Sequence, residues 1–113
     1  MNLFMVLRIV TSLSMACFLS GIAVAQSKAG DFRAGERLAL ANCSRCHSVG
    51  SAGASPLLQA PAFRFIAKKY KLEDLEEAFA EGILTGHNAM PEFVLTPDQI
   101  SNLTAYLQQL RDH

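Results

Sequence analysis

The sequence contains no tryptophan, only three cysteines and no excess of charge, since ten Lys and Arg side chains balance ten Asp and Glu in 113 residues. A general nucleic-acid-binding protein needs a basic face that neutralises phosphates. The neutral balance and the scattered basic residues argue against that class and favour a protein or small-molecule partner. The chain also lacks strand-like alternation, internal repeats and low-complexity tracts, and its length fits one domain.

Charge is almost absent from the N-terminal segment. Residues 9–25 carry none and end in Ala-Val-Ala, which is the form of a secretory signal peptide. The basic residue of this segment, Arg8, follows an apolar start, so an uncleaved membrane anchor is the alternative. We predict a signal peptide over residues 1–25 and one mature domain over residues 26–113, located in the periplasm.

The predicted mature domain is small. Its 88 residues bury a modest fraction of their surface, and domains of this size commonly need a disulfide, a metal or another covalent staple. Once the leader is removed, two cysteines remain, Cys43 and Cys46, together with one methionine, Met90. These residues are therefore the candidates for the staple.

Two capping patterns predict where helices begin. Asp31 is placed to accept hydrogen bonds from the start of a first helix that runs into Cys43. Thr96-Pro97-Asp98-Gln99 combines a threonine cap, a proline in the first turn and a glutamine that completes a capping box, so a last helix begins there. The predicted buried face of that helix, with Tyr106 beside it, consists of Ile100, Leu103, Leu107 and Leu110.

The pattern between these two helices is less regular. Residues 48–61 are rich in Gly, Ala, Ser and Pro and predict a loop. A short helix is expected over residues 63–70, and a second apolar stripe predicts another helix that starts near Leu72 and ends at Gly82 or Gly86. The sequence thus predicts an all-α domain of three to four short helices.

The motif that carries chemistry is Cys43-Ser44-Arg45-Cys46-His47, a pattern shared by four kinds of site. A zinc site could add His87, but the spacing from His47 fits no usual second ligand pair. A thioredoxin-like redox pair needs a preceding strand, and a disulfide closing so short a loop stabilises little. Covalent haem attachment is the interpretation that also uses His47, because the thiols form thioethers and the imidazole lies under the iron.

A proximal histidine leaves the sixth position of the iron open, and two residues compete for it. Met90 precedes Pro91, which favours an extended backbone, and lies in a polar stretch where a core-filling role is less expected. His87 would instead give an iron with two histidine ligands. We favour Met90, because Met/His ligation suits an electron-transfer haem. A sensor or gas-binding haem protein would require that Met90 does not ligate.

Taken together, these features resemble the small monohaem class I cytochromes c of bacteria over nearly all of the mature chain. The segments that carry the resemblance, besides the haem motif, are Gly35-Glu36-Arg37-Leu38, Ala60-Pro61-Ala62-Phe63, the run from Gly86 to Phe93, and Ala105-Tyr106-Leu107. The resemblance implies the cytochrome c fold, in which the short helices wrap around one haem c.

The same resemblance implies the roles of individual residues. Haem c is expected to be bound covalently through Cys43 and Cys46, with the iron ligated by His47 and Met90. The Pro61 carbonyl is expected to accept a hydrogen bond from the other ring nitrogen of the histidine, which fixes its tautomer. A close crossing of the first and last helices is also implied, with Gly35 packed against Tyr106.

With both axial positions filled by protein groups, no small-molecule substrate reaches the iron. We therefore expect a periplasmic electron carrier and not an enzyme, or alternatively the haem subunit of a larger dehydrogenase or oxidase complex. By resemblance, the redox partners are a quinol-oxidising complex, a periplasmic dehydrogenase or a terminal oxidase, and the carrier is a monomer. Basic residues within 64–71 and acidic residues within 73–81 form adjacent blocks, either a solvated helix face or a patch that steers a partner.

Overall fold

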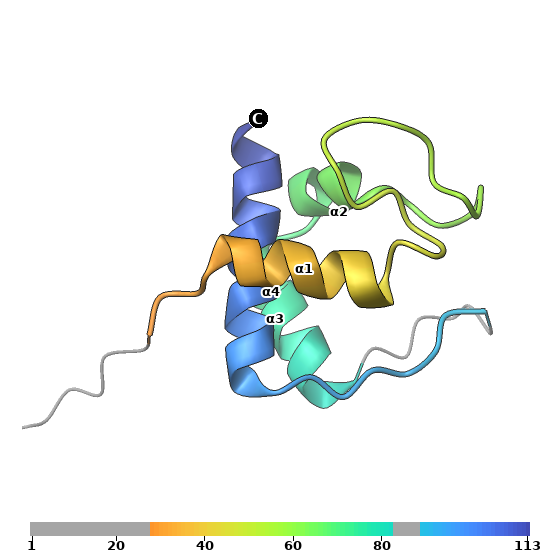
Figure 1. The fold of residues 1–113 in the computed structure, drawn as a ribbon. Coiled ribbons are helices and arrows are strands. Elements are labelled where there is room, and N and C mark those ends of the chain that lie inside the picture. Colours follow the sequence, from red (N-terminus) through yellow and green to blue (C-terminus); the bar gives the residue numbers. More distant parts are fainter. Residues whose placement is uncertain (1–27, 83–88) are drawn as a thin grey trace, which may run out of the picture.

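The structure is a computed structural model that describes residues 28–82 and 89–113. This part of the chain contains four helices. In chain order they are α1 (Phe32–Asn42), α2 (Phe63–Lys69), α3 (Leu72–Glu81) and α4 (Pro97–Asp112). No strand occurs within these ranges. The last helix packs against each of the other three, so the core is built around α4 (Figure 1). The all-α prediction is confirmed.

Helices α1 and α4 cross at unusually close range. A Cβ atom at Gly35 would lie 2.0 Å from the backbone oxygen of Asn102 and 2.9 Å from Cβ of Tyr106. The Asp31 carboxylate accepts hydrogen bonds from two amides at the start of α1, as its capping pattern predicted, and its own amide donates to Oδ1 of Asn102 at 2.7 Å. The implied close packing at Gly35 is therefore present, and it brings the two backbones together.

The capping box at the start of α4 is confirmed. Oγ1 of Thr96 accepts from the Gln99 amide, and the Gln99 side chain accepts from the Thr96 amide at 2.9 Å. All four apolar residues predicted on its inner face are buried. Tyr106, expected beside that face, is also buried. Its hydroxyl donates to the Val49 carbonyl at 2.6 Å, so that burial leaves no unsatisfied polar group on this side chain.

The two middle helices are short. The predicted helix over residues 63–70 ends at Lys69, because the backbone of Tyr70 is extended, with φ −109° and ψ 151°. Arg111 of α4 closes this end of α2, since its side chain donates hydrogen bonds to the carbonyls of Ala67 and Tyr70. Helix α3 ends at Gly82, whose φ of +84° favours glycine.

Three predictions of the sequence fall outside the described residues. These are the signal peptide or anchor over residues 1–25, a helix end at Gly86, and the competing ligand His87. In the described ranges, no helix is both long enough and apolar enough to cross a membrane.

Candidate functional site

The Cys-x-x-Cys-His motif forms one further helical turn after α1. The carbonyl oxygen of Cys43 accepts hydrogen bonds from the amides of Cys46, at 3.1 Å, and of His47, at 2.9 Å. Residues three and four positions apart in such a turn share one face. The turn therefore places the two thiols and the imidazole on one side, and both thiols are free and half-buried.

The surroundings of Cys43 disfavour a thiolate. Burial, and secondarily the neighbouring Cys46 thiol, raise the pKa of Cys43 to about 11, so this thiol stays protonated at neutral pH. Disulfide exchange needs the thiolate, whereas a thioether carries no charge and suits an apolar site. Among the described residues, no cluster of three or more His, Cys, Asp or Glu side chains could hold a metal ion.

The imidazole of His47 is held in one orientation by the loop that follows it. Its Nδ1 lies 2.7 Å from the carbonyl oxygen of Pro61, and its ring makes an edge-on contact with Phe63, with centroids 5.5 Å apart. Because a carbonyl can only accept, Nδ1 carries the proton. The lone pair of Nε2 is consequently left to bind a metal, as in other histidines whose second nitrogen is hydrogen-bonded.

Backbone hydrogen bonds bring the loop over residues 48–61 back to the motif. The Leu57 amide donates to the Cys46 carbonyl at 3.1 Å, and the Phe63 amide donates to the Ser48 carbonyl at 2.9 Å. The hydroxyl of Tyr106 holds Val49 from the side of α4. These contacts explain how Pro61, fourteen residues after His47, comes to lie beside it.

Met90 lies on a separate segment. It is half-buried, in the irregular stretch of residues 89–96 that leads into α4. In Figure 1 this pale blue segment extends to the same side of the molecule as the end of α1 and the loop over residues 48–61. The structure thus brings Cys43, Cys46, His47 and Pro61 together, and the role of Met90 as a ligand stays a prediction.

Arg64 lies beside the site in a way that the sequence does not indicate. The sequence groups it with the basic block of residues 64–71, but it is half-buried, and its guanidinium donates to Oγ of Ser48 and to the carbonyl of Gly53. The other three members, Lys68, Lys69 and Lys71, are exposed. Only these three lysines of the block therefore present their charge fully to solvent.

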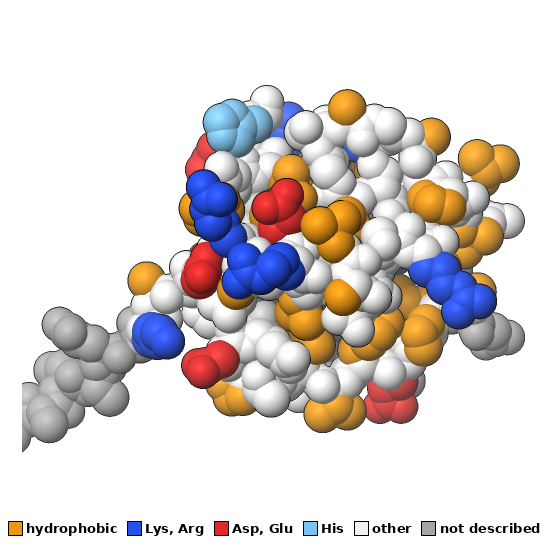
Figure 2. Space-filling view, viewed as in Figure 1, with side chains coloured by type: hydrophobic (Ala, Val, Ile, Leu, Met, Phe, Trp, Pro, Cys, Tyr) orange, Lys and Arg blue, Asp and Glu red, His pale blue; other side chains and the backbone are white. Residues whose placement is uncertain are grey.

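Apolar side chains of the loop after the motif and of the segment before α4 face solvent. Leu58 of the loop and Val94 of the segment before α4 are each 90% exposed, and Leu57 is 36% exposed. Figure 2 shows hydrophobic side chains spread over this side of the molecule. Two thiols, an imidazole with a free nitrogen and exposed apolar side chains are the groups that a covalently bound haem requires, so the residues present fit that cofactor.

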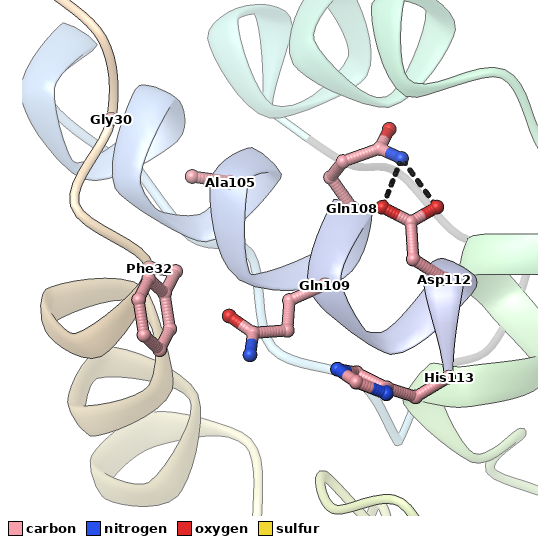
Figure 3. Close-up of a pocket in the computed structure, with 7 residues that line it drawn as sticks. All are labelled: Gly30, Phe32, Ala105, Gln108, Gln109, Asp112 and His113. Atoms are coloured by element: carbon pink, nitrogen blue, oxygen red, sulfur yellow. Dashed lines mark hydrogen bonds between the residues drawn. The ribbon is translucent and has the colours of Figure 1, made fainter.

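A surface hollow in the described part of the chain lies elsewhere, along α4 (Figure 3). Its lining consists of Gly30, Phe32, Ala105, Gln108, Gln109, Asp112 and His113. Nε2 of Gln108 donates to both carboxylate oxygens of Asp112, at 2.8 and 2.9 Å, and no thiol lines the hollow. It offers nothing comparable to the Cys-x-x-Cys-His turn.

Comparison with known proteins identifies the family of the chain. Residues 30–107 match the family described as "Cytochrome C oxidase, cbb3-type, subunit III". The chain is 36% identical to a cytochrome c6 of Picosynechococcus sp. over 85 residues, which cover 70% of this chain and 73% of the relative. It is 34% identical to a cytochrome c6 of Gloeothece citriformis over 105 residues, which cover 88% and 91%. No solved structure matches the chain.

The chain therefore belongs to this cytochrome c family and is a small monohaem class I cytochrome c of the bacterial type. Its helical architecture is that of the cytochrome c fold. It carries covalently bound haem c with its iron, and it is an electron-transfer protein rather than an enzyme. As an electron carrier it exchanges electrons with redox partner proteins.

Proposed function

We propose that this chain is a periplasmic electron carrier that binds haem c through Cys43 and Cys46 and ligates the iron with His47 and Met90. The observation that carries the proposal is the 2.7 Å hydrogen bond to the Pro61 carbonyl from Nδ1 of His47, which lies in the turn that also holds both thiols. When bound, haem c supplies an iron that gains and loses one electron. Together with Pro61, these four residues make up the five site residues that the sequence predicts.

Each residue has a distinct part in this function. Cys43 and Cys46 anchor the cofactor, and the Pro61 carbonyl holds the imidazole of His47 in the tautomer that leaves Nε2 free. The thioether of Met90 favours ferrous iron and so raises the reduction potential relative to a second histidine. With His47 and Met90 as its two protein ligands, the iron would have no position left for a substrate, and the chemistry that the group would supply is electron transfer.

The visible spectrum of the full chain, made in cells able to attach haem, tests the ligand set. We expect a low-spin thioether-linked haem whose ferric form has a weak far-red band from sulfur ligation. Met90→Leu should abolish that band, because leucine preserves the shape of methionine but cannot bind iron. His87→Ala serves as the matched control and should retain it. A low-spin wild-type spectrum that lacks the band, and that becomes high-spin in His87→Ala but not in Met90→Leu, would assign the sixth position to His87.

Export is the second part of the proposal. The uncharged stretch of residues 9–25 supports a signal peptide over residues 1–25, which would leave a mature domain of residues 26–113. Mass spectrometry of the haem-loaded protein from a periplasmic fraction should find a chain that begins at Gln26. A full-length chain recovered with membranes would instead identify the N-terminal segment as an anchor.

One observation favours a second candidate function. The family matched by residues 30–107 is named for a subunit of an oxidase, so this chain could serve as the haem subunit of a larger complex rather than as a free carrier. Purification of the chain from its native cells distinguishes the two. A fixed stoichiometry with one partner would support the subunit, whereas recovery of the haem-loaded chain as a monomer would support the free carrier.

A further inference from the structure

Ser48, which directly follows the proposed iron ligand, uses all of its polar groups. Its amide donates to Oγ of Ser55 at 3.0 Å, and its carbonyl accepts from the Phe63 amide at 2.9 Å. Its own Oγ donates to the Ala52 carbonyl at 3.1 Å and accepts from Nη1 of Arg64 at 3.2 Å. The backbone next to the ligand is therefore fixed from the loop on one side and from α2 on the other.

Arg64 joins these two sides with a single side chain. While Nη1 donates to Ser48, Nη2 donates to the carbonyl of Gly53 at 2.8 Å, so one guanidinium holds both ends of the turn over residues 48–53. The guanidinium also lies over the ring of Phe65, 4.6 Å from its centroid, which restrains its direction. A planar group with several fixed donors suits this task better than the single ammonium of a lysine.

The acceptors of Arg64 are informative. Both are neutral, a hydroxyl and a peptide carbonyl, and both belong to the loop that follows the iron-binding motif. Hydrogen bonds from a charged donor are stronger than neutral ones. The guanidinium is half-buried and directed at this loop, so its position indicates a role in holding the loop rather than in presenting charge to a partner.

We propose that Arg64 is a positioning residue of the haem site, which keeps His47 hydrogen-bonded to Pro61 by fastening the turn over residues 48–53 to the start of α2. The inference rests on the proposed role of His47 as an iron ligand. Three sets of contacts fasten the motif and the turn after it to Pro61 and the start of α2: the bond from His47 to Pro61, the bond from the Phe63 amide to Ser48, and the two donated by Arg64. Loss of the last set lets the loop open more often, and the imidazole bond opens with it.

The exchange rate of the Nδ1 proton of His47 with solvent tests this proposal. NMR of the ferrous, haem-loaded protein measures it directly, because that proton is protected while it is bonded to Pro61. Arg64→Gln should accelerate exchange by about tenfold or more, since hydrogen bonds to charged groups are among the stronger ones and their loss favours local opening. Arg64→Lys should give an intermediate rate, because an ammonium can still donate to one of the two acceptors.

Arg111→Gln is the matched control. Arg111 also donates to two backbone carbonyls of the α2 region, those of Ala67 and Tyr70, but at the end of that helix remote from Pro61. The Arg111→Gln variant should have a lower unfolding temperature, as Arg64→Gln does. It should leave the exchange rate of the imidazole proton near the wild-type value. Comparison of the two variants separates a local effect on the ligand from a general loss of stability.

Two results would overturn the proposal. An unchanged exchange rate in Arg64→Gln would show that the loop does not depend on the guanidinium. Equal acceleration in Arg64→Gln and Arg111→Gln would show that Arg64 contributes stability alone. A failure of His47 as the ligand is distinguishable, because the wild-type protein would then lack the low-spin spectrum before any variant is made.

Discussion

The crossing of α1 and α4 and the Cys-His site are held together in different ways. The crossing depends on apolar burial and on backbone approach at Gly35, and two of its side chains, Ala39 and Leu107, are 0% and 1% exposed. The site depends on hydrogen bonds, and its two thiols and its imidazole are only half-buried. Apolar packing therefore completes the scaffold, whereas polar contacts preorganise the site.

The apolar side chains around the site show what this difference means. Leu58 and Val94 face solvent, although a small domain has little apolar surface to spare. Covalently bound haem c would cover apolar surface that the chain itself leaves open, and would supply packing where the scaffold supplies none. The helical frame thus packs on its own, whereas the packing of the site would be completed by the cofactor.

Substitution of Gly35 should break the scaffold and give the largest effect. Gly35→Ala puts a methyl group 2.0 Å from a backbone oxygen of α4, and overpacking of this kind costs about 3 kcal/mol. The gain in helix propensity of alanine over glycine, about 1 kcal/mol, does not compensate. A melting temperature lower by about 10 °C is expected for a domain of this size.

Gly50→Ala is the control for this substitution. A Cβ atom at Gly50 would meet no heavy atom within 4 Å, and its φ is not positive. Its stability should stay within about 0.5 kcal/mol of the wild type. Thermal unfolding of the two haem-loaded variants, followed by circular dichroism, makes the comparison. Equal stability of both would refute the close crossing.

Tyr106→Phe should weaken the attachment of the loop over residues 48–61 to α4. The substitution keeps the ring but removes the hydroxyl that donates to the Val49 carbonyl at 2.6 Å. A buried carbonyl that loses its donor costs about 1–2 kcal/mol. Chemical denaturation measures this loss. Tyr70→Phe, at a ring that is 45% exposed, should cost less than about 0.5 kcal/mol, and a similar cost at both positions would contradict the assigned link.

Gly53→Ala tests the turn beside the site through backbone conformation and not through steric overlap. The φ of +90° at Gly53 is rarely adopted by residues with a side chain, while the nearest atom to an added Cβ, at 3.9 Å, would not obstruct it. We expect a loss of about 1 kcal/mol. Gly53→Ala should cost less when it is introduced into the Arg64→Gln variant, because that variant no longer holds the turn at Gly53. Additive losses in a double-mutant cycle would deny the coupling.

The sequence predicts the helices and the Cys-x-x-Cys-His turn because their determinants are local. Asp31 and Thr96 cap helices through residues within three positions, and the Cys-x-x-Cys-His motif is one turn of chain. The role of Arg64 could not be predicted in this way, because its acceptors lie 16 and 11 residues earlier, across a loop without a regular pattern. The burial of Tyr106 depends on a carbonyl 57 residues away. Local sequence patterns therefore predict the helices and the motif, but they do not predict contacts between residues that are far apart in the chain.

The smallest predicted effect is a dependence on alkaline pH that Tyr106 introduces. Burial, and secondarily the nearby Glu36, raise the pKa of the Tyr106 hydroxyl above its ordinary value of 10. The unfolded chain therefore loses this proton at a lower pH than the folded chain does. The stability contributed by the neutral hydroxyl is complete below about pH 10 and is lost as the pH rises through the folded-state pKa.

Comparison of wild type with Tyr106→Phe isolates this contribution from the lysines that titrate in the same range. The difference in free energy of unfolding between the two haem-loaded proteins should be constant from pH 7 to about pH 9 and should shrink above about pH 10. A difference that instead grows with pH would mean that the folded protein favours the ionised hydroxyl. The bond to the Val49 carbonyl could not then be the one that holds the loop, because a carbonyl accepts only from the protonated form.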